Sequence, residues 1–288
     1  MTTPQFHLEA LSPAYWRVTF SNGPVNLFDP DSVDELAALV GRAEQDEELR
    51  VIVFRSDNPD FFIAHWDFQS DPVRVAQMAP GPTGLHPYVD NFIRLGRLPA
   101  TTISLLRGRA RGTGSEFALA TDMRFASERA ILGQFEVGVG SVPGGGPMAR
   151  LGRLVGRGRA LEILLGADDV DAERAAAYGY VNRVIDDAVI EDEVDALARR
   201  IAGFDRVALT QTKALVDTAT LPGDDKEFAA GMQAFFATAG RPENLPIVRS
   251  LFARGLQRTD GVELNLGHDL TAVGARLRIV LDGIRTAA

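Results

Sequence analysis

Two glutamates are the residues of this sequence best placed to do chemistry. Glu116 lies in the stretch GTGSEFALATD, just inside an expected helix, and Glu136 lies between the strand-like stretch AILGQ and the glycine cluster of VPGGGP. Taken alone, a glutamate in a loop is most often a solvated surface residue. Two such carboxylates, twenty residues apart, can instead share acid and base roles around one water molecule.

The turn before Glu116 has two interpretations. Its glycines, Gly108, Gly112 and Gly114, follow the spacing G-x-x-x-G-x-G, which matches neither the dinucleotide-binding pattern nor a P-loop. The turn is either a tight strand-to-helix connection that uses the backbone freedom of glycine, or a helix start whose free N–H groups hold an anionic oxygen. In the second case it is an oxyanion hole, and Glu116 stands beside the reacting centre.

The composition argues against several other chemistries. The chain has 288 residues, a net charge of −9 and no cysteine. These properties argue against nucleic-acid and anionic-membrane partners and exclude thiol chemistry. The four histidines lack metal-binding spacing, so no metal site is expected. No apolar run approaches the roughly 20 residues of a membrane span, and no signal-peptide pattern is evident. We therefore expect a cytoplasmic protein.

The elements that must position the glutamates alternate between strands and helices. Residues 15–20 (YWRVTF) and 50–56 (RVIVFRS) predict strands, and the apolar spacing between them predicts a helix. Residues 71–87 are rich in proline and glycine and predict a loop. The last third of the chain has an almost wholly helical pattern. We expect an α/β core over residues 1–205 and a helical region over residues 206–288.

These stretches resemble the crotonase superfamily, which contains enoyl-CoA hydratases, enoyl-CoA isomerases and their relatives. FFIAHWDF resembles the family's F-x-A-G-A-D loop. LPATTISLLRGRARGTGSEFALATD resembles its signature K-P-x-I-A-x-x-x-G-x-A-x-G-G-G-x-E-L-x-x-x-x-D, and LGQFEVGVGSVPGGG resembles F-G-x-P-E-x-x-x-G-x-x-P-G-x-G. The resemblance runs from about Trp16 to Ile185, and more weakly to Asp217. It implies an α/β fold, a crotonase-like spiral of ββα units, with a C-terminal helical region that takes part in oligomerisation.

The resemblance also implies roles for individual positions. The backbone N–H groups of Trp66 and Thr113 would hold the thioester oxygen as an oxyanion hole. Glu116 and Glu136 would position and activate the water. The remaining substrate-binding positions that it implies are Val25, Ala64, His65, Asp67 and Gly112.

Three of these positions depart from the family pattern. His65 stands where the family has Gly, Trp66 where it has Ala, and Thr113 where it has Gly. The oxyanion donors are main-chain groups, so these changes do not delete them. His65 is a vestige, a packed side chain, or an added acid or base. The Trp66 indole either lines the acyl pocket, where it would favour planar acyl groups, or packs beneath its loop.

The function that the resemblance implies is that of an enoyl-CoA hydratase, which adds water reversibly and syn to a 2-enoyl-CoA. The alternatives are an enoyl-CoA double-bond isomerase or another crotonase-type lyase, and a family member that binds acyl-CoA without catalysis. The coenzyme A thioester is then the substrate, with no separate cofactor and no metal. The expected assembly is a homotrimer or homohexamer. The sequence does not name the acyl chain.

Overall fold

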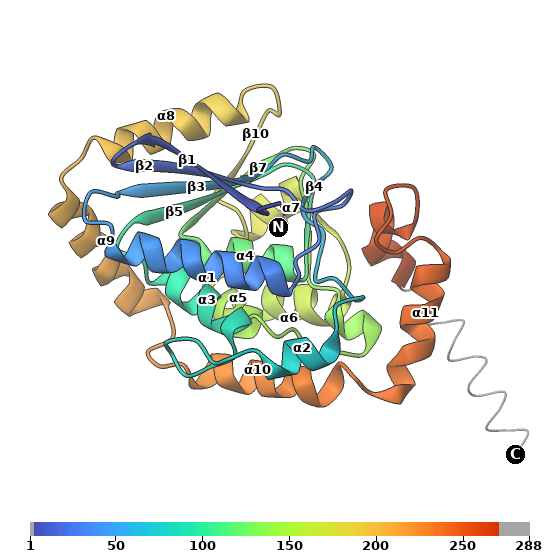
Figure 1. The fold of residues 1–288 in the computed structure, drawn as a ribbon. Coiled ribbons are helices and arrows are strands. Elements are labelled where there is room, and N and C mark those ends of the chain that lie inside the picture. Colours follow the sequence, from blue (N-terminus) through green and yellow to red (C-terminus); the bar gives the residue numbers. More distant parts are fainter. Residues whose placement is uncertain (1–2, 271–288) are drawn as a thin grey trace, which may run out of the picture.

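The computed structural model describes residues 3–270, which form two β-sheets with helices packed around them (Figure 1). In the larger, six-stranded sheet the first two strands pair antiparallel and all later neighbours pair parallel. Its strands, in spatial order, are β1 (Phe6–Ser12), β2 (Tyr15–Phe20), β3 (Val51–Ser56), β5 (Thr101–Leu106), β7 (Met123–Ser127) and β10 (Arg183–Ile185).

The smaller sheet has four strands, of which the first three are parallel and the last is antiparallel to its neighbour. In spatial order they are β4 (Phe61–Ile63), β6 (Arg109–Arg111), β8 (Ile131–Gly133) and β9 (Val170–Asp171). The chain passes from the larger sheet to the smaller one from β3 to β4, from β5 to β6 and from β7 to β8, and helical structure follows each pair. This repeat is the spiral of ββα units expected from the sequence.

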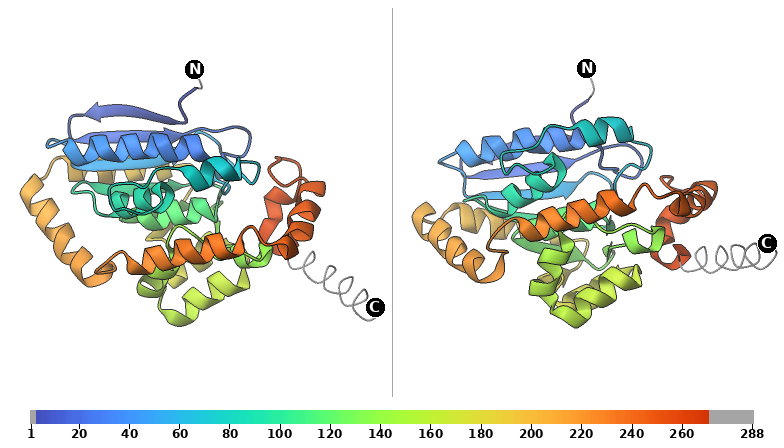
Figure 2. Two further views of the ribbon diagram at one scale, coloured as in Figure 1. Left: turned by 60° about the horizontal axis from the view of Figure 1, so that its bottom comes forward. Right: turned by 90° about the horizontal axis from the view of Figure 1, so that it is seen from below.

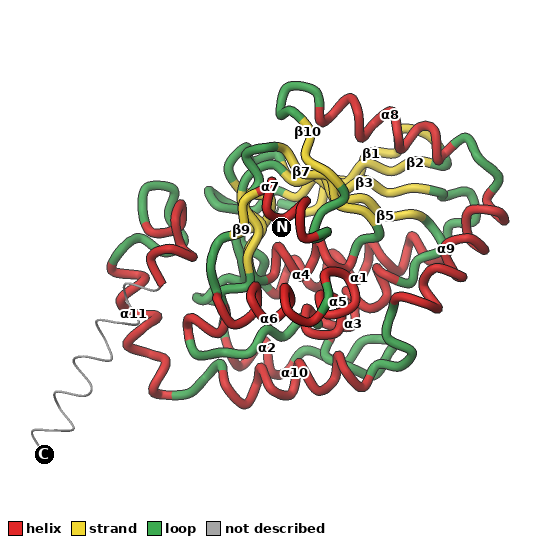
Figure 3. The backbone as a smooth tube through the Cα atoms, turned by 180° about the vertical axis from the view of Figure 1, so that it is seen from behind, coloured by secondary structure: helices red, strands yellow, loops and turns green. Residues whose placement is uncertain are grey.

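Helices cover both faces of the larger sheet, so its central strands are buried on both sides (Figure 3). In β3, Val51 and Val53 pack under α8, whereas Ile52 and Phe54 join the main core with α1, α3 and α4. Burial on both faces explains why this strand is a continuous apolar run. The helices are α1 (Pro30–Gln45), α2 (Pro72–Gln77), α3 (Pro87–Gly96), α4 (Thr113–Ala120), α5 (Pro147–Val155), α6 (Arg157–Gly166), α7 (Ala172–Tyr178), α8 (Ile190–Ala202), α9 (Arg206–Thr220), α10 (Lys226–Thr238) and α11 (Leu245–Ala253), with 3-10 turns η1 (Glu136–Val139), η2 (Pro242–Asn244) and η3 (Val262–Asn265).

The first predicted helix is confirmed as α1, and its start follows from local chemistry. The Asp29 carboxylate accepts a hydrogen bond from the Ser32 N–H at 2.8 Å, and the Ser32 hydroxyl in turn accepts one from the Asp29 N–H at 3.1 Å. Pro30 occupies the first helical turn, where its missing N–H costs nothing. The sequence prediction lacked β1, which pairs with β2 at the edge of the sheet.

The prediction of a loop over residues 71–87 was wrong in part, because this segment contains α2. Asp71 accepts a hydrogen bond from the Val73 N–H at 2.9 Å, and Pro72 follows it in the first turn. A capping carboxylate and an N-terminal proline are together a helix-start signal. The abundance of proline and glycine later in the segment concealed this signal.

The C-terminal region begins with α9, of which no side chain is buried; the helix lies at the opposite side of the molecule from α11 (Figure 2). In contrast, α10 packs against the core, where Met232 and Phe235 lie close to Gly144. No helix within residues 3–270 is long and apolar enough to cross a membrane. Residues 271–288, the end of the predicted helical region, lie outside the described residues.

Candidate active site

The smaller sheet brings the predicted site residues to one edge. Its strands β4, β6 and β8 run parallel, so their carboxyl ends lie side by side. Trp66 follows the end of β4, Thr113 follows β6 at the start of α4, and Glu136 follows β8. Glu116 lies in the first turn of α4. Four residues distant in sequence therefore reach one edge because three neighbouring strands end there.

Two glycines allow these segments to approach closely. A side chain at Gly114 would overlap the carbonyl oxygen of Ile63, so the first turn of α4 rests directly on the end of β4. Gly112 has a positive φ of +48°, and a Cβ there would lie 2.7 Å from Glu136 Oε1. Both positions need glycine for the space that a side chain would fill, and Gly112 also needs it for its backbone conformation.

The two predicted oxyanion donors have no acceptor among the residues that the structure describes. Phe28 engages the neighbours of Trp66: its N–H donates to the His65 carbonyl at 2.9 Å, and its own carbonyl accepts from the Asp67 N–H at 2.8 Å. The Trp66 N–H therefore faces away from Phe28. The Thr113 N–H belongs to the helix start, where no intrahelical acceptor exists. Within residues 3–270 neither N–H donates to a protein acceptor.

Glu116 is held by donors on both carboxylate oxygens. The side chain is only 2% exposed; Oε1 accepts from the Gly145 N–H at 2.8 Å, and Oε2 accepts from the Tyr88 hydroxyl. The Tyr88 oxygen also lies 2.8 Å from Thr113 Oγ1. Because the tyrosine gives its only proton to the carboxylate, Thr113 must donate to Tyr88. The Thr113 side chain thus extends a hydrogen-bond chain to Glu116.

Glu136 is in a less favourable environment for charge. Its Oε2 is buried and has no hydrogen-bond partner among the described residues. Burial raises the pKa of Glu136 well above its ordinary value, and the nearby Glu116 charge raises it further. Burial also raises the pKa of Glu116, but the hydrogen bonds from Tyr88 and Gly145 oppose that change. These opposed environments favour the charge on Glu116 and a proton on Glu136.

A buried cation stands behind Glu116. Arg150 donates from Nη2 to the Phe92 carbonyl at 2.7 Å and from Nη1 to the Gly145 carbonyl at 3.3 Å. Burial lowers the pKa of Arg150 to about 9, and the charge of Glu116 opposes this decrease. Sequence reasoning missed Arg150 and Tyr88. Each lies about thirty residues from Glu116 in the chain, and no local pattern joins them.

His65 is enclosed rather than exposed at the edge. Its ring is fully buried and lies edge-on to the rings of Phe68 and Phe135. Nδ1 lies 2.6 Å from the Trp66 carbonyl oxygen, and Nε2 lies 3.0 Å from Glu263 Oε2. The side chain is therefore a packed group with two polar partners, as in the second of the three sequence interpretations.

The other predicted substrate positions surround the same strand end. Val25 and Ala64 are fully buried in a small apolar cluster with Phe61. The Asp67 carboxylate accepts a hydrogen bond from the Gln257 side chain at 2.8 Å, which ties the loop to the C-terminal region. The roles of these residues toward a substrate stay predictions.

The Trp66 indole is partly buried against aromatic neighbours. Its ring centroid lies 5.4 Å from that of Tyr88 in an edge-on arrangement and 6.4 Å from that of Phe28. The indole thus contacts the tyrosine that binds Glu116. It also packs against the main core, so both sequence interpretations of this side chain retain support.

Comparison with known proteins places these features in a family. The profile of the enoyl-CoA hydratase/isomerase family matches residues 14–243. A crystal structure from Streptomyces avermitilis, described as a candidate enoyl-CoA hydratase, is 39% identical, covers 94% of this chain and 98% of its own, and superimposes with a TM-score of 0.88. The crotonyl-CoA hydratase of Syntrophomonas wolfei is 30% identical over 233 residues, 79% of this chain and 89% of its own.

A third relative, the short-chain-enoyl-CoA hydratase of Clostridium acetobutylicum, is 29% identical over 213 residues, which are 73% of this chain and 80% of the relative. The residues matched by the family profile include both glutamate-bearing turns. The resemblance drawn from the sequence is confirmed: the chain belongs to the enoyl-CoA hydratase/isomerase family.

Proposed function

We propose that this protein is an enoyl-CoA hydratase, which adds water reversibly to the Cα–Cβ double bond of a 2-enoyl-CoA thioester. The observation that supports it most strongly is the unequal environment of the two glutamates. One has donors on both oxygens, and the other has a buried oxygen with no hydrogen-bond partner within residues 3–270. Hydration requires one carboxylate to take a proton and one carboxylic acid to give one.

In the proposed reaction the Glu116 carboxylate takes a proton from water, and the water oxygen forms a bond to Cβ. The electron pair of the double bond moves toward the thioester carbonyl and gives enolate character at its oxygen. The N–H groups of Trp66 and Thr113 stabilise that oxygen. Glu136 then gives its proton to Cα. The proton taken by Glu116 replaces it after the product leaves, so no cofactor or metal is needed.

The test is a panel of 2-enoyl-CoA substrates with short, long and aromatic acyl groups, in which loss of the conjugated double bond is followed optically and the product is identified by mass. Formation of a 3-hydroxyacyl-CoA is the expected result. Binding of acyl-CoA without turnover of any substrate in the panel would show a non-catalytic family member.

Double-bond isomerisation is the second candidate, because a single glutamate can shuttle a proton between two carbons. Glu136 has a buried oxygen with no partner in the described part of the chain. The same panel should include 3-enoyl-CoA substrates. Faster conversion of a 3-enoyl-CoA to its 2-enoyl isomer than hydration of that isomer would favour this alternative.

We further propose that the Trp66 indole borders the acyl group. Its edge-on contact with Tyr88 places it beside the residue that binds Glu116. Trp66→Ala keeps the backbone donor, so it should change the preference among short and aromatic acyl-CoAs more than the rate on a small substrate. Equal losses on all substrates, with reduced thermal stability, would indicate a packing role.

A homotrimer or homohexamer is part of the proposal. It is supported by α9, whose apolar side chains include Leu215 at 74% and Val207 at 60% exposure. Light scattering should give a mass of three or six chains, and the mass of a single chain would contradict it. We also propose a cytoplasmic location and a role in fatty acid metabolism, and cell fractionation tests the location.

A further inference from the structure

The His65 ring has two hydrogen-bond partners, and both are acceptors. Nδ1 lies 2.6 Å from the carbonyl oxygen of Trp66, which has no proton to give. Nδ1 must therefore carry one. Nε2 lies 3.0 Å from Glu263 Oε2, so a second proton must lie between these two atoms. The arrangement requires two protons for the ring and the carboxyl group together.

The surroundings place that second proton on His65. Glu263 Oε2 already accepts from the Gln257 N–H at 2.8 Å, which favours the carboxylate. Burial raises the pKa of the Glu263 carboxyl, but His65, the Gln257 N–H and the charge of Arg111 together lower it. Arg111 also donates to the Glu263 carbonyl at 2.7 Å. The pKa of His65 is raised: burial opposes the charge, but Glu263 and the Trp66 carbonyl together outweigh it. Both side chains are 0% exposed, and Glu263 Oε1 has no hydrogen-bond partner among the described residues, so the contacts of Oε2 are what favour an imidazolium beside a carboxylate.

We propose that His65 is a positioning residue. As an imidazolium clamp it links the Trp66 carbonyl to the Glu263 carboxylate, so the geometry of the oxyanion hole depends on docking of the C-terminal segment 257–264. The proposal rests on the function proposed above for the Trp66 N–H. The peptide groups on either side of Trp66 are held by Phe28. The His65 ring bonds the carbonyl of the second of these, the Trp66–Asp67 peptide, whose N–H is on Phe28, so this peptide is held from both sides.

The segment that carries Glu263 is fixed to the core independently of His65. Arg109 on β6 donates from Nε to the Leu264 carbonyl at 2.9 Å. Arg111, which contacts the Glu263 carbonyl, is itself paired with Asp169 at 2.6 Å. The carboxylate therefore stands on a rigid support, and the oxyanion loop is held against that support.

The clamp has a defined pH window. The charged groups around the His65 ring are Glu263 on η3, Arg111 on β6 with Asp169 behind it, and Asp67 on the loop itself. Because the pKa of His65 is raised, its stabilisation is complete below the ordinary histidine pKa and is lost as pH rises through the folded-state value. The lowered pKa of Glu263 means that the pair also fails as pH falls through that value.

The charge state can be tested without any substrate. His7 and His268 are exposed and His86 caps α3, so the triple variant His7→Gln, His86→Asn, His268→Gln leaves His65 as the only histidine. The ¹⁵N shifts of its ring should report protons on both nitrogens at pH 7, and adding Glu263→Gln should remove one of them. A ring that is neutral at pH 7 before Glu263 is changed would overturn the proposal.

Positioning is separated from folding by two further variants. His65→Phe keeps the aromatic packing but leaves the Glu263 charge buried and unpaired, which destabilises the fold. Adding Glu263→Gln removes that charge, so the double variant should recover thermal stability. It should still show amide exchange on the order of 10-fold faster at Asp67, whose N–H belongs to the clamped peptide and donates to the Phe28 carbonyl, with β3 amides unchanged. An unaltered Asp67 exchange rate in the double variant would mean that His65 only packs.

The effect on catalysis is a separate readout. The double variant should lower kcat on the order of 10-fold with little change in KM, because the oxyanion donor acts mainly in the transition state. His268→Phe, in the same C-terminal region, is the matched control and should change neither constant. A wild-type protein with no hydratase activity would refute the proposed function, while the ring protonation and the exchange rate would still decide whether the clamp exists.

Discussion

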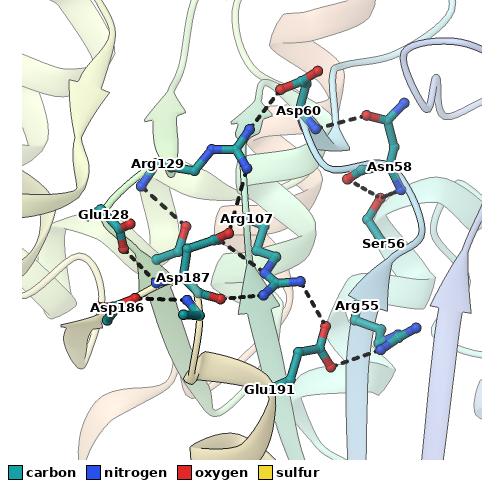
Figure 4. A network of polar contacts seen from close by, with 12 residues as sticks. Arg55, Ser56, Asn58, Asp60, Arg107, Glu128, Arg129, Asp186, Asp187 and Glu191 are labelled. Atoms are coloured by element: carbon teal, nitrogen blue, oxygen red, sulfur yellow. Dashed lines mark hydrogen bonds and ion pairs between the residues drawn. The ribbon is translucent and has the colours of Figure 1, made fainter.

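Among the described residues, charged groups form ion pairs at the carboxyl edge of the larger sheet, whereas the two glutamates at the carboxyl edge of the smaller sheet form none. Where the chain leaves the larger sheet, arginines and carboxylates neutralise one another in a connected network (Figure 4). Arg107 lies 3.1 Å from Asp187 and 3.4 Å from Glu191, which also pairs with Arg55 at 2.8 Å. Arg129 continues the network through Asp187 at 3.6 Å. Each cation in it has a carboxylate partner.

At the corresponding edge of the smaller sheet, polar groups are brought together without being neutralised. Two carboxyl groups share one buried region, and within residues 3–270 one of their oxygens and two N–H donors lack hydrogen-bond partners. Unsatisfied buried groups cost stability, so a folded protein retains them where a ligand or reaction uses them. No ion pair within residues 3–270 includes Glu116 or Glu136, whereas each cation at the edge of the larger sheet has a carboxylate partner.

The largest expected effect comes from removing the acid or the base at the carboxyl edge of the smaller sheet, the unpaired edge, which carries Glu116 and Glu136. Glu116→Gln and Glu136→Gln should each lower kcat for hydration by about 10²–10⁴-fold, the usual contribution of a positioned acid or base. The amide is nearly isosteric, so circular dichroism and melting temperature should change little. Glu191→Gln is the matched control, because Glu191 belongs to the ion-pair network at the carboxyl edge of the larger sheet, the paired edge. Near-native turnover in either site variant would refute the two-glutamate mechanism.

A methyl group added at Gly145 should displace the Glu116 carboxylate. A Cβ at Gly145 would overlap Glu116 Oε2, whereas a Cβ at Gly152 would meet no heavy atom within 4 Å. We expect Gly145→Ala to lower kcat on the order of 10²-fold through misplacement of the carboxylate. Gly152→Ala, in α5, should leave the rate unchanged. Equal rates for the two variants would mean that Glu116 does not need its present position.

A smaller effect should follow from the loss of one donor to Glu116. Tyr88→Phe keeps the ring against Trp66 and removes the hydroxyl that favours the carboxylate, so the pKa of Glu116 should rise. The base must be ionised, and activity is lost as pH falls through this pKa. The acid limb of the kcat profile should therefore move to higher pH, with a loss of about 10-fold near neutrality.

Thr113→Val removes the hydroxyl that donates to Tyr88, one hydrogen bond further from Glu116. The acid limb of the kcat profile should move to higher pH by less than in Tyr88→Phe, because Tyr88 keeps its proton for Glu116. A Tyr88→Phe profile that is lower at every pH without a shifted limb would contradict a role in setting the charge of Glu116. It would indicate a packing role for the tyrosine.

Much of the framework was predictable from sequence because its signals are local. The apolar runs of the strands, the Asp29 cap of α1 and the glycine spacing around Glu116 are each read within a few residues. The family pattern then placed both glutamates. The segment containing α2 was misread because the later prolines and glycines outweighed the Asp71 cap.

The partners of the site residues could not be predicted in this way. Tyr88, Arg150 and Glu263 reach the site only through tertiary packing, and none has a sequence neighbour that indicates its role. His65 illustrates the limit, because its type allowed three interpretations and only the distant Glu263 selects one. The two proton states of the glutamate pair likewise depend on burial and hydrogen bonds, which no residue spacing encodes.

The smallest effect on catalysis is expected at the paired edge, where each cation already has a carboxylate partner. Glu191→Gln removes the charge that pairs with Arg55 and Arg107, and it lies in the first turn of α8, where a negative charge is also favoured by the helix. Since the pairs are partly exposed, the free energy of unfolding should fall by only about 1 kcal/mol. The loss should shrink in about 1 M salt, which screens such pairs. Denaturant unfolding at low and high salt measures it, and kcat should stay within about two-fold because no group at the unpaired edge is touched. A larger fall in kcat with unchanged stability would mean that the paired edge also serves the reaction, and the distinction between the two edges would not hold.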